Sequence, residues 1–197
     1  MSGAATSALW YFGRGFGVSA LVLFSLVVVL GILTRAGRPL PGLPRLAVTT
    51  VHRTASLAAL VFLGLHVTTL LLDPYAQLQV ADVVLPFLAA YRPLWQGLGT
   101  LALDLVVVLV ASSLLRHRIG LGAWRLLHWA AYLCWPLAVA HALGTGSDNR
   151  TGWLLGVATA CVVVVLAAVC WRVTGRRFAT PAAPARVAPP SDVAGLR

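Results

Sequence analysis

The hydrophobic pattern divides the chain into long apolar runs separated by short polar segments. Five runs contain about 20 residues or more with few charges, which is the length that a helix needs to cross the hydrocarbon of a membrane. The pattern therefore predicts an all-α integral membrane bundle of five transmembrane helices. The runs cover about residues 10–34, 48–72, 94–115, 124–143 and 153–173.

A further stretch, residues 75–93, mixes apolar and polar positions. Gln79 and Asp82 are interleaved with its Val and Leu residues, and Pro86 interrupts it. The stretch is too short and too polar to span a bilayer. We expect an amphipathic segment that lies at the outer membrane interface.

Composition agrees with a membrane protein, because 59% of the residues are apolar and only 10% are charged. A soluble domain is nearer about a quarter charged. The net charge of +10 would suggest a nucleic-acid partner in a soluble protein, but all 15 basic residues are Arg and most lie between the apolar runs. We interpret them as topology signals in a lipid bilayer and predict no nucleic-acid binding.

The distribution of Arg predicts the orientation of the chain, because cytoplasmic loops are enriched in basic residues. The N-terminus is expected outside and the C-terminus in the cytoplasm, and the Ala- and Arg-rich composition is typical of a bacterial inner-membrane protein. Residues 1–9 would form an outer extension, 10–174 the bundle and 175–197 a disordered cytoplasmic tail. The Arg residues assigned to the cytoplasm are Arg35, Arg38, Arg45, Arg53, Arg116, Arg118, Arg125, Arg172, Arg176 and Arg177.

Four of the five histidines lie in just two of the apolar runs, His52 and His66 in the second, His128 and His141 in the fourth. Their separations of 14 and 13 residues correspond to about 20 Å along a helix. Because the two helices cross in the same direction, the histidines pair by depth. His52 and His128 are expected near the cytoplasmic side, and His66 and His141 near the outer side.

The second helix can present both of its histidines to one neighbour, because 14 residues return to within about 40° of the same face. The fourth helix fits less well, since 13 residues leave its two histidines about 140° apart on an ideal helix. A tilt, or a kink at Pro136, would have to reduce that angle.

Two imidazoles at each depth favour haem over zinc, because zinc normally takes four clustered ligands, or three and a water. A six-coordinate haem needs only two axial ligands from the protein. A lone intramembrane histidine often just hydrogen-bonds a neighbouring helix, but four that pair by depth favour a functional site. His117, which stands between two Arg residues, is expected in solvent or at the interface. The absence of a CxxCH motif excludes covalent c-type attachment.

Four charged residues lie at suitable depths to support such sites. Arg14 is expected near the outer haem, where it would pair with a propionate or an anionic acceptor, or else extend to the outer headgroups. Arg53 and Arg125 flank the inner histidines, either as propionate contacts or as cytoplasmic anchors. Asp104, in the middle of the third run, would accept a hydrogen bond from a ligand imidazole, pair with Arg, or stay protonated.

These features resemble the ferric reductase-like transmembrane family, which includes the membrane parts of NADPH oxidases and ferric reductases and the haem subunit of bacterial methionine sulfoxide reductase systems. The resemblance covers about residues 10–175 and implies two b-type haems, held by His52 with His128 and by His66 with His141. Family members typically have six spanning helices, and this chain is expected to lack the first. The most specific matching segments are Val51–Thr54, Leu127–Tyr132 and Tyr91–Trp95, together with the 14 and 13 spacings.

The resulting expectation is electron transfer through the membrane by the haem-bearing subunit of an oxidoreductase. Only about 22 residues follow the last helix, too few for a flavin and nicotinamide domain. The donor would therefore be a partner, either a cytoplasmic flavoprotein or a membrane quinol, and the acceptor would lie on the outer face. The alternative is a non-redox transporter or assembly protein that uses the histidines to handle protons or metal ions.

Overall fold

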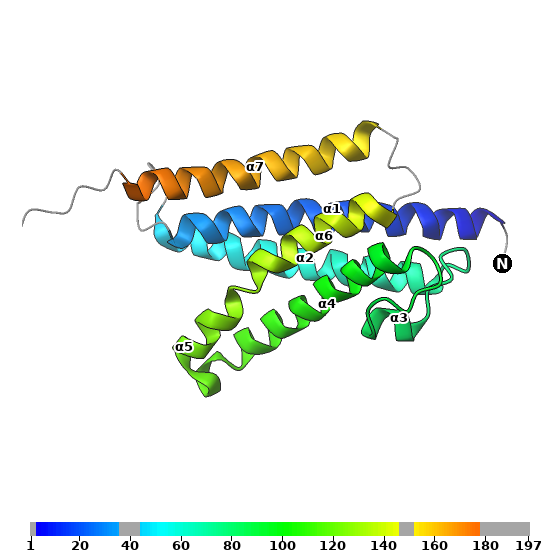
Figure 1. Cartoon of the computed structure of the whole chain (residues 1–197), viewed down its shortest axis with the longest axis horizontal. Coiled ribbons are helices and arrows are strands. Elements are labelled where there is room, and N and C mark those ends of the chain that lie inside the picture. Colours follow the sequence, from blue (N-terminus) through cyan, green and yellow to red (C-terminus); the bar gives the residue numbers. More distant parts are fainter. Residues whose placement is uncertain (1–2, 36–43, 146–151, 178–197) are drawn as a thin grey trace, which may run out of the picture.

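The computed structural model describes residues 3–35, 44–145 and 152–177, and all regular elements in these ranges are helices. This confirms the all-α prediction. The predicted tail beyond residue 177 lies outside the described residues. The helices, labelled in Figure 1, are α1 (Gly3–Arg35), α2 (Arg45–Leu72), α3 (Val80–Val84), α4 (Pro93–Leu114), α5 (Arg116–His128), α6 (Ala131–Thr145) and α7 (Gly152–Arg177).

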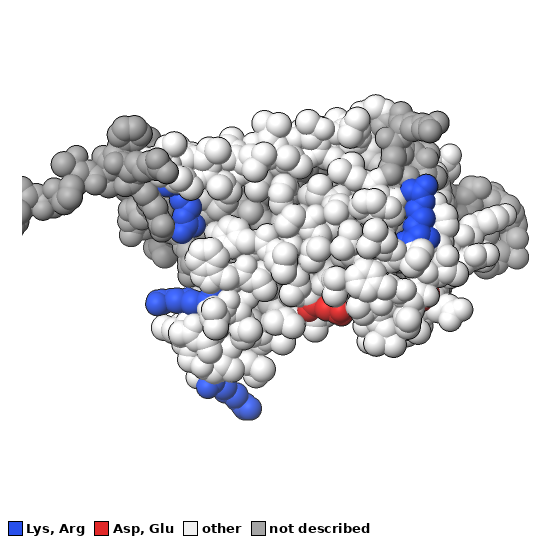
Figure 2. Space-filling view, in the orientation of Figure 1, with Lys and Arg blue, Asp and Glu red and all other residues white. Residues whose placement is uncertain are grey.

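Four of these helices, α1, α2, α4 and α7, are long and apolar enough to cross a membrane. Helices α5 and α6 together would form a fifth span, although they are bent by 46° at their junction. The multi-pass membrane prediction is therefore confirmed, with four or five spans. Figure 2 agrees, because basic side chains lie near the two ends of the molecule and the band between them is almost entirely uncharged.

The fourth predicted helix differs from expectation, because it is broken. A continuous helix was expected over residues 124–143, but α5 ends at His128 and α6 begins at Ala131. The N–H groups of Trp129 and Ala130 bond to carbonyls three residues earlier, at 3.1 and 3.0 Å, instead of four. Such tight turns end a helix and let the chain change direction. Pro136, where the kink was expected, lies within α6 beyond the bend.

The stretch 75–93 is a folded loop with one short helix, α3, rather than an extended amphipathic helix. The Asp82 carboxylate accepts the Gln79 N–H at 2.9 Å and so closes the first turn of α3. The Thr100 hydroxyl of α4 donates to the Asp82 carbonyl at 2.7 Å, which fixes the loop against α4. The position of the loop at a membrane interface stays a prediction.

Helix α1 is at the centre of the bundle and packs against α2, α6 and α7, while α4 packs against α6. Figure 1 shows α7 and α2 running beside α1, whereas α5 projects from the bundle with the end of α4. The core between α4 and α6 is built on Ala102, Val106 and Cys134, with Phe24 and Leu63 packed against it. The bundle thus brings the middle of α1, α2, α4 and α6 around a common centre.

Close contact between α4 and α6 depends on Gly144. A side-chain carbon added there would collide with the indole ring of Trp95, so we expect Gly144→Ala to lower the stability by about 1–3 kcal/mol. Thermal unfolding in detergent measures the effect. Gly156→Ala in α7 is the control, because nothing lies within 4 Å of the added carbon. Equal melting temperatures for the two variants would show that this contact does not limit α4–α6 packing.

Candidate functional site

The histidines His66 on α2 and His141 on α6 come together across the bundle. Their ring centroids are 6.5 Å apart and the ring planes are inclined at 77°. The two residues are 75 positions apart in the sequence, and α2 and α6 do not share an extensive direct interface, since α2 packs mainly on α1 and α6 on α4. The pair therefore bridges a space between the helices.

Each of these rings is anchored by a hydrogen bond to the backbone of a neighbouring helix. Nδ1 of His66 is 2.7 Å from the Gly13 carbonyl oxygen on α1, and Nδ1 of His141 is 2.9 Å from the Trp95 carbonyl oxygen on α4. Because a carbonyl only accepts, Nδ1 must carry the hydrogen in both rings. The lone pair is then on Nε2, the nitrogen left available to a metal.

A cavity of about 440 Å³ lies between α1, α2, α4 and α6, and both rings line it. Its volume is within the usual range for cofactor and ligand sites, about 300–1,000 Å³. Small residues from three of the helices form much of its wall and leave room for a flat group. They are Gly17, Ala20, Gly99, Ala102, Ala138 and Ala142.

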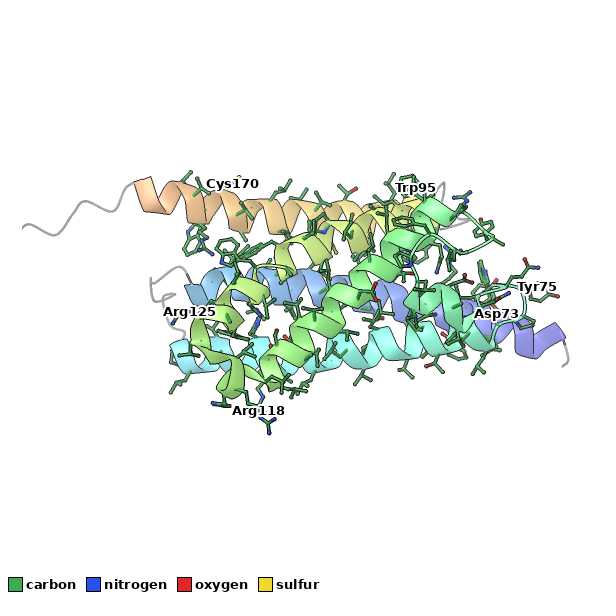
Figure 3. All side chains as sticks on the ribbon, turned by 60° about the horizontal axis from the view of Figure 1, so that its bottom comes forward. Asp73, Tyr75, Trp95, Arg118, Arg125 and Cys170 are labelled. Carbon is green, nitrogen blue, oxygen red and sulfur yellow. The ribbon has the colours of Figure 1, made fainter. Side chains whose placement is uncertain are left out.

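Arg14 contributes a positive charge to the same cavity. Its guanidinium lies over the indole ring of Trp10, 4.5 Å from the ring centroid. Tyr75 and Gln96 also line this part of the cavity. Figure 3 shows that Tyr75 and Trp95 lie toward one end of the bundle, with Arg118 and Arg125 toward the other.

The second predicted pair, His52 and His128, is arranged differently. His52 is half-buried on α2, with Nδ1 3.1 Å from the Val27 carbonyl oxygen on α1. His128 is the last residue of α5 and its ring stacks on Trp124, with centroids 5.1 Å apart. Within the described ranges no ring contact joins His52 to His128, because the bend after His128 carries α5 away from α1 and α2. Their pairing stays a prediction.

The other predicted charged residues lie outside the cavity. Arg53 and Arg125 are exposed, on α2 and α5, and Asp104 is half-buried on α4. The Nδ1 atoms of His52, His66 and His141 bond to backbone carbonyls instead of the Asp104 carboxylate.

One polar contact between the two histidine levels was not anticipated from the sequence. Nε1–H of Trp135 on α6 donates to the Ser25 hydroxyl on α1 at 2.9 Å, and that hydroxyl donates to the Leu21 carbonyl at 2.8 Å. Ser25 is buried. A single serine within an apolar run is a signal for such an interhelical bond, since polar groups inside a membrane are expected to find partners.

The sequence also matches a known family, described as the ferric reductase like transmembrane component, over residues 16–139. The chain belongs to this family. Ferric reductase-like domains typically bind haem and transfer electrons across membranes. The matched region includes His52, His66 and His128, while Arg14 and His141 lie just outside it. No curated protein and no solved structure matches this ferric reductase-like chain significantly.

The Trp135–Ser25 bond can be tested through the stability of the protein. Ser25→Ala leaves the indole N–H without its acceptor in apolar surroundings, so we expect a loss of about 1–3 kcal/mol. Ser112→Ala is the control, because Ser112 is equally buried and its hydroxyl donates only to the Leu109 carbonyl of its own helix. Thermal unfolding in detergent compares them. If both variants melt together, the interhelical bond contributes nothing beyond the loss of a buried hydroxyl.

Proposed function

We propose that this chain is a membrane cytochrome b that carries electrons across a bacterial inner membrane through two b-type haems. The observation that carries the proposal is the His66–His141 pair, whose Nδ1 atoms are both bonded to carbonyls on the far side of the rings from the cavity. The chain would be the haem-bearing subunit of an oxidoreductase. Its donor would be a cytoplasmic flavoprotein or a quinol, and its acceptor would lie on the outer face.

The distance between the two rings fits a shared iron. With metal–nitrogen bonds of about 2 Å, two imidazoles on opposite sides of one metal have ring centres about 6 Å apart. The observed separation is 6.5 Å. Among the residues that the structure describes, no cluster of three or more His, Cys, Asp or Glu could hold a metal ion. Two protein ligands suit a metal whose other four positions a porphyrin fills.

The inner site is proposed by extension of the same arrangement. His52 is anchored to α1 through Nδ1 as His66 is, and the 14-residue separation puts it about 20 Å deeper. His128 is its proposed partner, from its depth and from the family resemblance. A haem at each level supplies one-electron exchange, with a potential that depends on the axial ligands, burial and hydrogen bonding.

The remaining charged residues have proposed supporting roles. Arg14 would bind a propionate of the outer haem, because it lines the same cavity as His66 and His141. Arg53 and Arg125 would bind propionates at the inner level, or hold the cytoplasmic ends of their helices at the headgroups. Asp104 lies within α4 and would pair with an Arg or stay protonated.

Haem content tests the proposal directly. Purified wild-type protein should show two haems b per chain in a pyridine haemochrome spectrum. His66→Ala and His141→Ala should each remove about half of the haem, and both should remove the same spectral component, because the two rings serve one site. His117→Ala is the control and should retain both haems. A wild-type protein without haem, after expression with ample haem supply, would exclude electron transfer and favour the transporter or assembly alternative.

The proposed direction of electron flow requires the N-terminus outside and the C-terminus in the cytoplasm. A fluorescent protein fused after Arg197 should fluoresce, because it matures in the cytoplasm. Alkaline phosphatase fused after Pro74, between α2 and α3, should be active, because it folds outside. The same phosphatase fused after Arg118 serves as the control and should be inactive. The reverse pattern would invert the assignment of inner and outer levels.

A further inference from the structure

Three of the four histidine rings dock on the bundle by the same arrangement. In each, Nδ1 bonds to a backbone carbonyl, and a glycine stands four residues after that carbonyl. The carbonyl and glycine pairs are Gly13 with Gly17 for His66, Val27 with Gly31 for His52, and Trp95 with Gly99 for His141.

We propose that Gly17, Gly31 and Gly99 are positioning residues, each of which opens the carbonyl four residues before it so that a ligand histidine can dock there. The inference rests on the proposed function, because it takes the docked rings to be haem ligands. Each docked ring is held as the Nδ1–H tautomer, with Nε2 turned toward the metal.

The physical reason lies in the geometry of the helix. The carbonyl of residue n already accepts the N–H of residue n+4, and its second lone pair points outward. The Cβ of residue n+4 leans toward the helix N-terminus and therefore stands over that lone pair. Glycine has no Cβ, so the carbonyl can accept a second donor and an imidazole can approach the backbone.

The three docks differ in how tightly the ring fits the glycine. A Cβ added at Gly17 would lie 2.8 Å from both Cε1 and Nδ1 of His66. At Gly99 it would lie 2.5 Å from Cε1 of His141 and closer still to Nδ1. At Gly31 it would lie 3.5 Å from Cε1 of His52, an ordinary contact. Gly15, on the same helix as Gly17, has nothing within 4 Å of such a carbon.

The spacing of the docks on α1 matches the spacing of the ligands on α2. Gly17 and Gly31 are 14 residues apart, as are His66 and His52. Because α1 and α2 are adjacent along the chain and run side by side in opposite directions (Figure 1), one repeat in α1 meets the same repeat in α2. The match explains how both imidazoles of α2 rest on a single neighbouring helix.

His128 is held by a different contact. Its ring stacks on Trp124, whose Nε1–H donates to the Ser113 hydroxyl on α4 at 3.4 Å. Ser113 stands 14 residues after Gly99, where a third glycine dock on this spacing would fall. The glycine arrangement therefore accounts for three ligands and leaves the fourth to a side-chain contact.

The experiment compares alanine variants of the full chain, purified with haem: Gly17→Ala, Gly99→Ala, Gly31→Ala and the control Gly15→Ala. Electron paramagnetic resonance of the ferric protein and a redox titration follow each haem separately. Gly17→Ala and Gly99→Ala should shift the spectrum and the midpoint potential of the same haem, or remove that haem, and leave the other unchanged. Gly15→Ala and Gly31→Ala should match the wild type at both haems.

A bulkier substitution extends the test to the inner level. Gly31→Leu should shift the spectrum and potential of the haem that Gly17→Ala and Gly99→Ala leave unchanged, because the larger side chain reaches the His52 ring. An effect of Gly31→Leu on the outer haem alone would contradict the assignment of Gly31 to His52.

Other outcomes separate this inference from the proposed function. Two haems in the wild type, with Gly17→Ala and Gly99→Ala indistinguishable from Gly15→Ala, would overturn the glycine inference alone. Equal loss of both haems from Gly17→Ala and Gly99→Ala would also overturn it, because that result indicates general damage to packing instead of displacement of one ring. A wild-type protein without haem would overturn the proposed function and this inference together.

Discussion

An imidazole placed in the apolar interior of a membrane protein needs an acceptor for its N–H group, because an unmade hydrogen bond there costs more than in water. In this chain main-chain carbonyls of the neighbouring helices accept those hydrogens for His52, His66 and His141. The bonds join α1 to α2 and α4 to α6, the same pairs that pack most closely. Helix placement and ring orientation therefore depend on one kind of contact, and the cavity between the pairs follows from it.

Hydropathy and residue type predicted most of the fold. The apolar runs located α1, α2, α4 and α7 to within a few residues apart from the start of α1, since the length of an apolar stretch is a local property. The break between His128 and Ala131 could not be predicted in this way, because Trp129 and Ala130 belong to an apolar stretch as well suited to a continuous helix. The loop around α3 depends on its contact with Thr100, which is distant in sequence.

The candidate site was predictable in its ligands but not in its supports. Pairing by depth indicated His66 with His141, and the structure brings these two rings together. The carbonyls that hold the rings have no side-chain signature, so only the structure reveals them. For His52 and His128, depth gave the same expectation, but the direction of α5 depends on backbone turns that residue types do not encode strongly.

The bend between α5 and α6 makes the two ends of one predicted span mechanically independent. Helix α6 is held against α4, α1 and α7, whereas α5 has no buried residue. The short hinge at Trp129 and Ala130 therefore lets α5 rotate as a lever, moving His128 while His141 keeps its place against Trp95. A molecule that pushes or pulls on α5 from the membrane surface acts on one level of the bundle and spares the other.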